Sequence, residues 1–257
     1  MTGQVTLARE GRIATLTFDR PEARNAMTWA MYQQLAQHCR QLATERTARV
    51  VVMRGAGGEA FVAGTDISQF ADFRTGDDGV AYERQIDDGI ALIEALPMPT
   101  LAVIDGWAVG GGLAIANACD FRIASPKSRF GVPIARTLGN TLSIANLARL
   151  QAGWGLQRVR RMLVLAELIN ADEALACGWL QALCASEDLQ AEAGKLCDRL
   201  LALAPVTQAV TKEGLRRINL AGLPQGDDLV RTCYGSADFQ EGVQSFGEKR
   251  AAVWRGA

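Results

Sequence analysis

Three consecutive glycines, Gly110, Gly111 and Gly112, are the first candidates for chemistry in this sequence of 257 residues. Each glycine costs about 1 kcal/mol relative to alanine inside a helix, so a run of three suggests that something must approach the backbone itself. The apolar stretch 101–104 predicts a strand before the glycines, and the small residues after them predict a helix that carries no charge until Asp120. The first N–H groups of a helix lack partners and carry partial positive charge, so they could bind a developing oxyanion.

A second backbone donor would complete such an oxyanion site. The best candidate in the chain is the stretch 61–67, FVAGTDI, a small-residue turn that follows an apolar run. Two main-chain amides from separate turns would then hold one oxygen atom, and the chemistry would depend on backbone groups more than on side chains.

The two stretches together resemble the crotonase (enoyl-CoA hydratase/isomerase) superfamily. The resemblance is carried by F-x-A-G-x-D-I, by D-G-x-A-x-G-G-G at 105–112 and by Cys119-Asp120, and it extends from DRPEARNAM at 19–27 to DFQEG at 238–242 and FGEKR at 246–250. Separated motifs in the right order are far more specific than a lone triple glycine. The resemblance therefore covers nearly the whole chain.

This resemblance implies an α/β fold, a crotonase-like spiral of β-β-α turns with a C-terminal helical region. It also implies a lyase or isomerase of fatty acid metabolism that acts on an acyl-CoA thioester, with coenzyme A present only as part of the substrate and no other cofactor. A homotrimer or a dimer of trimers is implied as the assembly. The domain division that we expect is 1–187 for the spiral core with the CoA site and 188–257 for a helical oligomerisation region packed against it.

The same resemblance assigns roles to individual residues. The N–H groups of Thr65 and Gly111 would hold the thioester carbonyl and stabilise an enolate. The adenine end of CoA would contact Ala63, Asp66 and Ile67, with Ala23 and Arg24 nearby. Phe246 and Lys249 fall where the family's C-terminal helix completes the CoA pocket, often from a neighbouring subunit; the alternative for Lys249 is an ordinary surface lysine.

The acid and base residues are where this chain departs from the hydratases. They carry one glutamate two residues after the glycine run and a second after the proline of F-G-x-P-E, and here these places hold Ala114 and Ile134. Neither side chain can transfer a proton, whereas adding water across a double bond needs both an acid and a base. We therefore do not expect ordinary two-glutamate hydration; decarboxylation and hydrolysis remain open, as does a non-catalytic acyl-CoA-binding oligomer.

Arg136 and Asn140 are the polar candidates that remain nearby. Asn140 falls roughly where a decarboxylating branch of the superfamily places a polar residue, and its amide could orient a carboxylate or water but not act as a base. Arg136 could bind an acyl carboxylate through its planar guanidinium. The structural alternative is that Arg136 pairs with an acid and Asn140 caps the helix that carries Ile144 and Leu147.

Other carboxylates could substitute for the missing glutamates, but the spacing pairs none of them, so each is expected to be a solvated surface group. They are Asp66, Asp72, Asp77, Asp78 and Glu83. The stretch 70–83, rich in Asp and Gly, is expected to be mobile, as a lid or as a plain connection. Asp120 is expected to close the glycine helix or to bond a backbone turn.

The elements that must position these residues alternate along the chain. The stretch 13–18 alternates apolar and polar residues like a half-buried strand, and 50–53 and 121–124 are short apolar runs. Between the first two, a helix that Thr28 caps should bury one face. Such alternation favours an α/β architecture but does not separate a doubly wound sheet from a stacked spiral. Beyond about Ser186 only helices are expected.

Composition narrows the class further. With 49% hydrophobic residues, 21% charged residues and a formal net charge of −1, the chain resembles a soluble globular protein. Scattered Lys and Arg predict no nucleic-acid partner, and the absence of a long apolar run or a signal-like start predicts no membrane contact and a cytoplasmic location. A phosphate loop is not expected, because neither G-x-G-x-x-G nor G-x-x-x-x-G-K-[ST] occurs.

Metal and thiol chemistry are not expected either. The single histidine, His38, lies beside the apolar face of a predicted helix and is interpreted as structural. No C-x-x-C pair occurs, so the cysteines are interpreted as buried small hydrophobes rather than as disulfides or metal ligands. The six are Cys39, Cys119, Cys177, Cys184, Cys197 and Cys233.

Overall fold

Two sheets form the frame of the molecule in a computed structural model, which describes residues 3–45 and 47–256. In the larger sheet, only the first pair of strands is antiparallel and the other neighbours are parallel. Its order is β1 (Gln4–Glu10), β2 (Ile13–Asp19), β3 (Val50–Gly55), β5 (Thr100–Ile104), β7 (Phe121–Ala124) and β10 (Ala182–Leu183). The smaller sheet has the order β4 (Ala60–Val62), β6 (Trp107–Val109), β8 (Arg129–Gly131) and β9 (Ile169–Asn170).

From β3 to β8, successive strands alternate between the two sheets. The chain passes from β3 to β4, from β5 to β6 and from β7 to β8, and each step leaves the larger sheet for the smaller one. A helix follows the first two of these pairs directly or after a short turn, so each unit is one β-β-α turn of a spiral. The spiral that the resemblance implied is confirmed, and it is a distinction that hydrophobic periodicity could not make.

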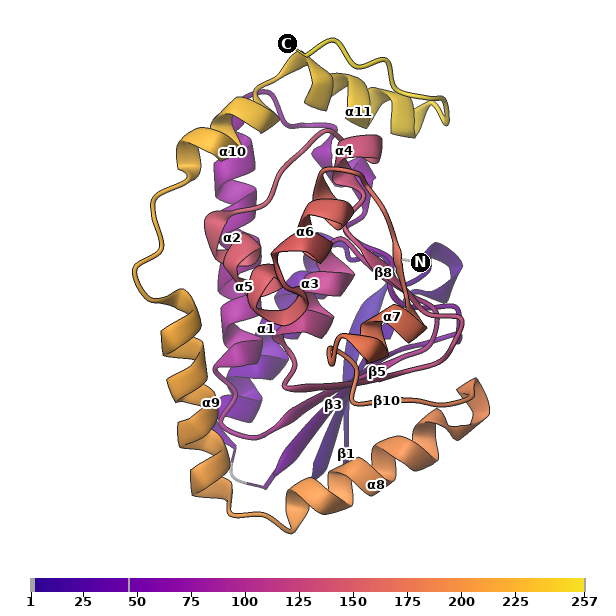
Figure 1. Cartoon of the computed structure of the whole chain (residues 1–257), viewed down its shortest axis with the longest axis vertical. Helices are drawn as coiled ribbons and strands as arrows, with labels where there is room; N and C mark the ends of the chain where they lie inside the picture. Colours follow the sequence, from indigo (N-terminus) through magenta and orange to yellow (C-terminus); the bar gives the residue numbers. More distant parts are fainter. Residues whose placement is uncertain (1–2, 46, 257) are drawn as a thin grey trace.

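Helices pack around this frame (Figure 1). Those of the spiral are α1 (Trp29–Thr44), α2 (Gly76–Glu94), α3 (Gly111–Ala118), α4 (Ile134–Thr137), α5 (Ile144–Trp154), α6 (Leu156–Leu163) and α7 (Ala171–Ala176). Short 3₁₀ turns occur at Pro21–Ala23, Ile67–Phe70 and Ser186–Asp188. Thr28 caps α1 as predicted, because its hydroxyl accepts a hydrogen bond of 3.3 Å from the N–H of Met31.

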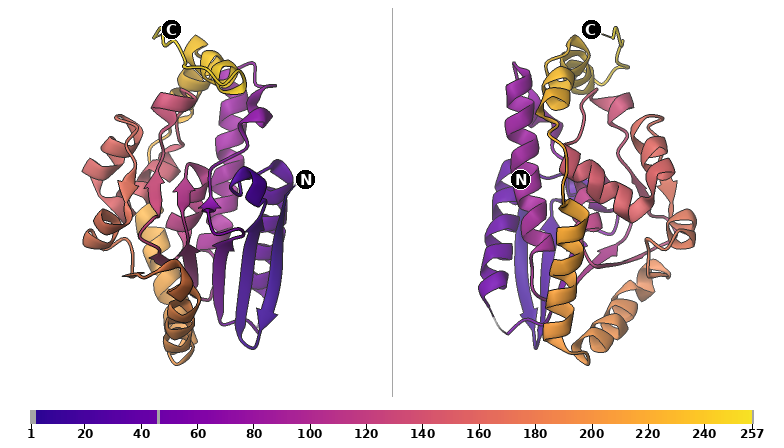
Figure 2. Two further views of the ribbon diagram at one scale, coloured as in Figure 1. Left: turned by 90° about the vertical axis from the view of Figure 1, so that its right-hand side faces the viewer. Right: turned by 60° about the vertical axis from the view of Figure 1, so that its left-hand side comes forward.

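After β10, the described residues form four α-helices and no strand, and the sequence predicted that only helices would follow in this region. They are α8 (Leu189–Leu201), α9 (Pro205–Leu220), α10 (Asp227–Tyr234) and α11 (Ala237–Gly247). In Figures 1 and 2, α8 and α9 lie at the end of the molecule where β1 and β3 are labelled, while α10 and α11 cap the opposite end. The C-terminal region thus reaches both ends of the spiral.

The two faces of the larger sheet bury different helices. Val51 and Met53 of β3 belong to the main core, which includes the apolar faces of α1, α2 and α3. The alternate residues Val50 and Val52 face Leu196 and its neighbours on α8. The C-terminal helical region is therefore packed against the spiral core, as expected. The domain division at 187/188 stays a prediction.

The stretch 70–83 differs from the mobile segment that we expected. The chain is helical from Gly76, and Thr75 and Asp78 form a capping box at this helix start. Added Cβ atoms on Gly76 and Gly79 would overlap the backbone of Arg231 and the ring of Tyr234, both on α10. The glycines that suggested a loop thus allow a close contact between two helices, and Asp78 caps the start of a helix.

The remaining bulk features are simple. Within 3–45 and 47–256, none of the helices combines the length and apolar character needed to cross a membrane. The six cysteines are free; Cys39, Cys119 and Cys197 are buried, as interpreted, and the other three are only partly buried. His38 bonds the carbonyl of Val5 at 3.0 Å, which agrees with a structural role.

Candidate active site

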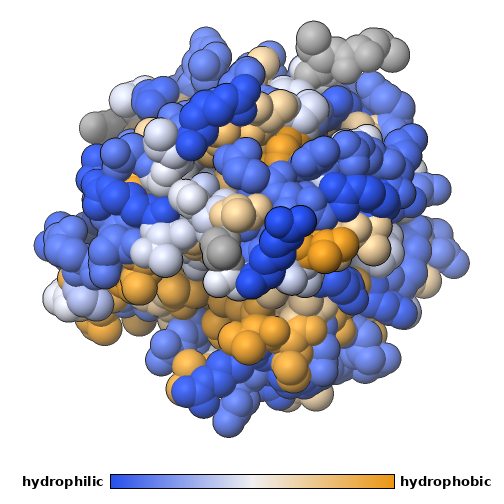
Figure 3. Space-filling model, turned by 90° about the horizontal axis from the view of Figure 1, so that it is seen from above, coloured by the Kyte–Doolittle hydropathy of each residue, from blue (hydrophilic) through white to orange (hydrophobic). Residues whose placement is uncertain are grey.

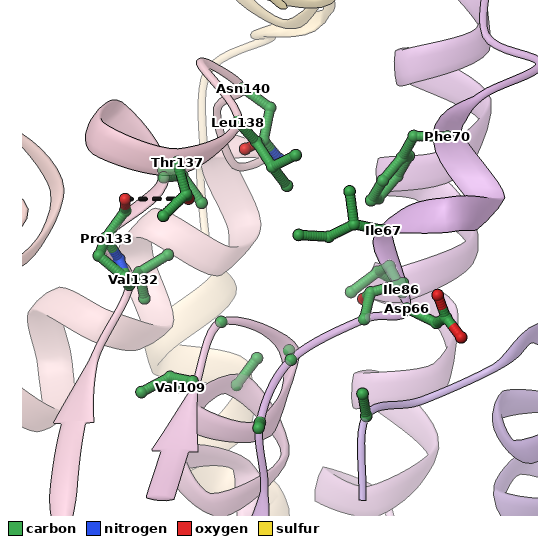
Figure 4. Close-up of a pocket in the computed structure, with 18 of the residues that line it drawn as sticks. Asp66, Ile67, Phe70, Ile86, Val109, Val132, Pro133, Thr137, Leu138 and Asn140 are labelled. Atoms are coloured by element: carbon green, nitrogen blue, oxygen red, sulfur yellow. Dashed lines mark hydrogen bonds between the residues drawn. The ribbon is translucent and has the colours of Figure 1, made fainter. Parts of the chain in front are cut away.

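A cavity of about 900 Å³ opens beside the glycine run. It lies between the turn after β4, the start of α3, the face of α2 and the segment from α4 to α5. In the close-up of Figure 4, Ile67 and Phe70 approach from one side and Leu138 and Asn140 from the other. A space of this size fits an extended small-molecule group, and its walls are largely apolar.

The two backbone turns that we selected from the sequence meet at this cavity. Strands β4 and β6 are parallel neighbours, so the turns at their carboxyl ends lie at one edge of the sheet. The turns touch, because a Cβ atom on Gly110 would lie 3.5 Å from the Cα of Gly64. The structure therefore brings together the two turns that the sequence analysis selected.

The amides of Thr65 and Gly111 are free to bind a ligand. In the part of the chain that the structure describes, neither N–H has an intramolecular acceptor, and both residues line the cavity. The flanking amides are occupied, since Asp66 N–H donates to the Met27 carbonyl at 2.9 Å and Gly110 N–H to the Gly131 carbonyl at 2.9 Å. Two unpartnered donors from adjacent turns can hold one oxyanion.

The structure shows a separate reason why each of the positions 110, 111 and 112 requires glycine. Gly110 adopts φ +55° and ψ −126°, a conformation that residues with a Cβ rarely adopt. A Cβ on Gly111 would collide with the Tyr32 hydroxyl, and one on Gly112 would overlap the Val62 carbonyl of β4. The protein's own packing thus requires the glycines too, in addition to the ligand approach that we expected.

A chain of hydroxyl groups lies next to the Thr65 amide. The Thr65 hydroxyl bonds the Tyr32 hydroxyl at 2.8 Å and the Tyr82 hydroxyl at 2.9 Å. Burial raises the pKa of Tyr32 to about 12 and that of Tyr82 well above its usual value, so both phenols stay protonated at neutral pH. Sequence reasoning missed both tyrosines, which are brought together only by the packing of α1 against α2.

Glu83 is the carboxylate that sequence reasoning misplaced. We expected a solvated group, but Glu83 lines the cavity with only 3% of its surface exposed. Its Oε1 accepts from the Tyr234 hydroxyl at 2.8 Å and its Oε2 from the Ser143 N–H at 2.9 Å. Burial raises the pKa of Glu83 to about 7, against the smaller opposing effect of these hydrogen bonds.

A signal for this position existed in the sequence. Val80, Ile86, Ile90 and Ile93 recur at helical spacing and form the buried face of α2, and Glu83 occupies the same face. A lone acid in an apolar stripe of a helix is seldom an ordinary surface group. We missed it because we assigned the stretch to a loop.

Asn140 and Arg136 differ in where they lie. Asn140 lines the cavity, and its Nδ2 donates to the Tyr234 hydroxyl at 3.0 Å. Its Oδ1 is buried without a partner among the described residues. It does not cap α5, because Ser143 does so, accepting from the Asn146 N–H at 3.1 Å. Arg136 is exposed, lies outside the cavity lining and forms no ion pair within the described residues.

The two positions at which the resemblance led us to expect glutamate in a hydratase both face the cavity. Ala114 and Ile134 line it, and Ile134 is buried with 9% exposure. Both side chains are apolar and cannot transfer a proton.

The residues expected to bind CoA all line the same cavity. They are Ala23, Arg24, Ala63, Asp66, Ile67, Phe246 and Lys249. Arg24, Phe246 and Lys249 are exposed, which places them at the mouth, where a phosphate-bearing group would meet two positive charges. Asp66 is engaged in an ion pair with Arg20 at 2.7 Å, so its carboxylate is already neutralised.

The other candidate acids have structural partners or face solvent. Asp72 is exposed, Asp77 pairs with Arg231, and Asp78 caps the first turn of α2. Asp120 does not bond a turn, as one of our two alternatives had it, because it accepts at 2.7 Å from the N–H of Thr100, the first residue of β5; it also pairs with Lys212. Within 3–45 and 47–256 no three His, Cys, Asp or Glu residues group in a way that could hold a metal ion.

The chain is similar in sequence to a known enzyme family over nearly its whole length. The model of the family described as enoyl-CoA hydratase/isomerase matches residues 8–257. A short-chain-enoyl-CoA hydratase of Clostridium acetobutylicum is 30% identical over 251 residues, which cover 96% of this chain and 95% of the relative. An (E)-benzylidenesuccinyl-CoA hydratase of Thauera aromatica is 32% identical over 265 residues, covering 98% of this chain and 99% of the relative.

Solved structures give the same answer for the fold. A methylmalonyl-CoA decarboxylase in complex with 2-nitronate-propionyl-CoA superposes with a TM-score of 0.89 at 26% sequence identity, covering 98% of each chain.

Proposed function

The chain belongs to the enoyl-CoA hydratase/isomerase family, and on that premise we propose that its cavity binds an acyl-CoA thioester and stabilises its enolate. The observation that carries the proposal is the pair of unpartnered N–H groups of Thr65 and Gly111 at one edge of the cavity. They would hold the thioester oxygen as negative charge develops on it. Removal of one such donor typically costs 10²–10³ in rate, about 2.7–4 kcal/mol.

The mouth of the cavity suits the CoA moiety. Arg24 and Lys249 would face its phosphates, while Ala63, Asp66 and Ile67 would lie against the adenine. The two relatives, which are CoA hydratases, and the CoA ester bound to the decarboxylase support this choice of substrate class. Coenzyme A would enter as part of the substrate, so the proposal needs no separate cofactor.

The reaction that we propose is of the lyase or isomerase type, and it is not two-glutamate hydration. Ala114 and Ile134 cannot activate water or protonate a carbon, although both face the cavity. Activity therefore has to come from the two amides and from polar groups elsewhere on the wall.

A panel of CoA esters tests the proposal. Purified protein is incubated with crotonyl-CoA, a 3-enoyl-CoA, a malonyl-type CoA and a 3-oxoacyl-CoA, and the products are separated chromatographically. We expect turnover of at least one ester and slow hydration of crotonyl-CoA. Brisk hydration would contradict the argument from Ala114 and Ile134. Calorimetric binding without any turnover would indicate a non-catalytic acyl-CoA binder, and the absence of binding would refute both.

Decarboxylation of a malonyl-type CoA ester is a second candidate. The structural similarity to a methylmalonyl-CoA decarboxylase favours it. The bond from the α-carbon to the carboxylate would break, CO₂ would leave, and the electron pair would form the same enolate between the two amides. Release of CO₂ from the malonyl-type ester in the panel distinguishes this candidate from the first.

A further inference from the structure

We infer that Glu83 of α2 is the proton-transfer residue of this cavity, and that Tyr234 and Asn140 position it. The inference rests on the proposed binding of an acyl-CoA thioester and adds the acid–base group that the chain lacks at Ala114 and Ile134. It assigns that role to a helix that contributes neither of those two positions.

The first argument is where α2 is held. Tyr82, the residue before Glu83, bonds the Thr65 hydroxyl at 2.9 Å. This contact fixes one turn of α2 to the very residue whose amide forms half of the oxyanion site. Glu83 therefore lines the same cavity as the two amides on a rigid element rather than on a loop.

The second argument is that, among the residues that the structure describes, Glu83 has no ion pair that would compensate for its burial. A carboxylate without a charged partner is costly to bury, yet Glu83 has 3% exposure and neutral hydrogen-bond donors only. Two other carboxylates line the cavity within the described residues, Glu22 and Asp66. Glu22 is exposed and Asp66 is paired with Arg20, so Glu83 alone has the environment of a proton-transfer group.

The third argument is the set of contacts that orients the carboxyl group. Gly79 lies one helical turn before Glu83, and its missing side chain admits the ring of Tyr234 against α2. The Tyr234 hydroxyl then reaches Glu83 Oε1 at 2.8 Å, and Asn140 Nδ2 reaches the same hydroxyl at 3.0 Å. A base oriented by a second group and that group by a third is the arrangement seen around catalytic acids and bases.

Asn140 provides an independent sign that this part of the wall receives a ligand. Its Oδ1 is buried without a hydrogen-bond partner among the described residues, although such groups are nearly always satisfied. A polar group of the substrate that donates a hydrogen bond would satisfy it. Asn140 therefore both completes the hydrogen bonds around Glu83 and indicates that a ligand binds at this part of the wall.

Electrostatics agrees with the geometry. Burial raises the pKa of Glu83 to about 7, so both protonation states are populated near neutral pH. Asp87 raises it further, while Arg149 of α5 offsets the charge of Asp87 through an ion pair of 2.9 Å. The remaining ionisable neighbours have raised pKa values and stay protonated; they are Tyr32 on α1, Tyr82 on α2, and Cys233 and Tyr234 on α10.

A single acid–base group limits the reaction. The Glu83 carboxylate would take a proton from a carbon of the acyl chain, and the C–H electron pair would move into the enolate held by the two amides. The protonated Glu83 would then exchange its proton with solvent and deliver a proton to the same carbon or to another carbon of the conjugated system. The balance needs no second base and no water, so a shift of a double bond in an enoyl-CoA fits better than hydration.

Deuterium exchange tests the role of Glu83. Wild-type protein and Glu83→Gln are incubated with a panel of 2-enoyl-CoA and 3-enoyl-CoA esters in D₂O, and deuterium in the acyl chain is measured by mass spectrometry. We expect the wild type to exchange and Glu83→Gln to lose at least about 100-fold in exchange rate. The Kd for the ester should change only a few-fold, since the amides and the cavity mouth remain. The matched control is Asp88→Asn, which changes an exposed carboxylate on the same helix.

The outcomes separate this inference from the proposed function. Failure of the wild type to bind any ester would refute the proposed function, whereas binding without exchange into any enoyl-CoA ester would refute proton transfer by Glu83. Exchange by the wild type together with undiminished exchange by folded Glu83→Gln would refute the role of Glu83 alone. Tyr234→Phe covers the case in which Glu83→Gln does not fold.

Tyr234→Phe removes the hydrogen bond that lowers the pKa of Glu83. The pKa should therefore rise, and the pH at which exchange reaches half its maximum should move upward by about half a unit or more. A merely structural role of Tyr234 would lower the rate without moving this pH, and an unmoved pH would contradict the positioning role.

Discussion

Glu83 shows how one side chain can couple the protonation of the active site to folding. Its pKa is raised from the ordinary 4.5 to about 7 because the folded protein buries the carboxyl group. Between these two pKa values, Glu83 therefore keeps its proton in the folded state and loses it in the unfolded state. Stability contributed by the neutral form is present below the unfolded pKa and is lost as the pH rises through the folded pKa.

This coupling predicts a pH-dependent difference between the wild type and Glu83→Gln. The stability of the wild type relative to the variant should fall by up to about 1.4 kcal/mol per pH unit between about pH 5 and about pH 7. Urea unfolding at several pH values measures it. A difference that stays constant with pH would show that Glu83 is not buried as described.

The glycine run gives a second prediction at the level of single residues. Gly112→Ala should destabilise the protein by about 1–3 kcal/mol or more, because its Cβ would overlap the Val62 carbonyl. Gly194→Ala on α8 is the matched control, since a Cβ there meets nothing within 4 Å; it should stabilise by about 0.4–1 kcal/mol. Urea unfolding compares the two. Equal effects would mean that the close approach of α3 to β4 is not required.

How far the sequence predicted the site depends on what kind of group is concerned. The amides of Thr65 and Gly111 could be predicted because their motifs are local stretches of chain. The arrangement of Glu83, Tyr234 and Asn140 could not, because it depends on packing between residues separated by 94 and 151 positions. The absence of glutamate at Ala114 and Ile134 was visible, but what replaces it was not.

At the scale of helices and strands, regular patterns were predictable and composition misled. The strands 13–18, 50–53 and 121–124 lie within β2, β3 and β7 because short apolar runs favour buried strands. The prediction of a loop over 70–83 was wrong for the beginning of α2, because the first turn of this helix is built from Gly and Asp. A helix that packs closely against another needs small residues, and a helix start favours acids, so loop-like composition arose from two helical requirements.

Helix α9 is tied to the body in a way that can be tested. It buries no residue of its own, but Lys212 pairs with Asp120 and donates to the Met98 carbonyl at 2.8 Å. Lys212→Met should destabilise the protein by about 1–3 kcal/mol and speed hydrogen exchange over 205–220, with β5 less affected.

The control for this change is Lys195→Met on α8. Lys195 is an exposed lysine whose ion pair with Glu192 lies within one helix, so its loss should change stability by no more than about 0.5 kcal/mol. Unchanged exchange over 205–220 in Lys212→Met would show that α9 is held by its other contacts.

At the scale of the whole molecule, apolar surface remains uncovered. Seen from the end that carries α10 and α11, apolar side chains gather in patches between polar ones (Figure 3). On and near α9, five large apolar side chains are more than half exposed, namely Leu203, Val206, Val210, Leu215 and Ile218. Contiguous exposed apolar surface is typical of protein–protein interfaces.

On the family resemblance we propose that the protein assembles as a trimer or a dimer of trimers, and the exposed apolar side chains suggest that α9 contributes to the contacts. Sedimentation should give a mass at least three times the 27.6 kDa of one chain. Val206 and Val210 lie one turn apart on α9, so replacing both with Glu should shift the protein toward smaller species. A monomeric wild type would contradict the proposal.

The hydroxyl that orients Glu83 comes from residue 234, near the end of the chain, whereas both amides of the oxyanion site are complete by residue 111. During synthesis on the ribosome, both amides therefore emerge well before Tyr234, and Phe246 and Lys249 of the cavity mouth emerge later still. A nascent chain that ends before Tyr234 would carry the oxyanion site, but the Glu83 carboxyl group would lack the hydroxyl that orients it. Catalysis should therefore require the last helices of the chain, and a truncated product should lose it.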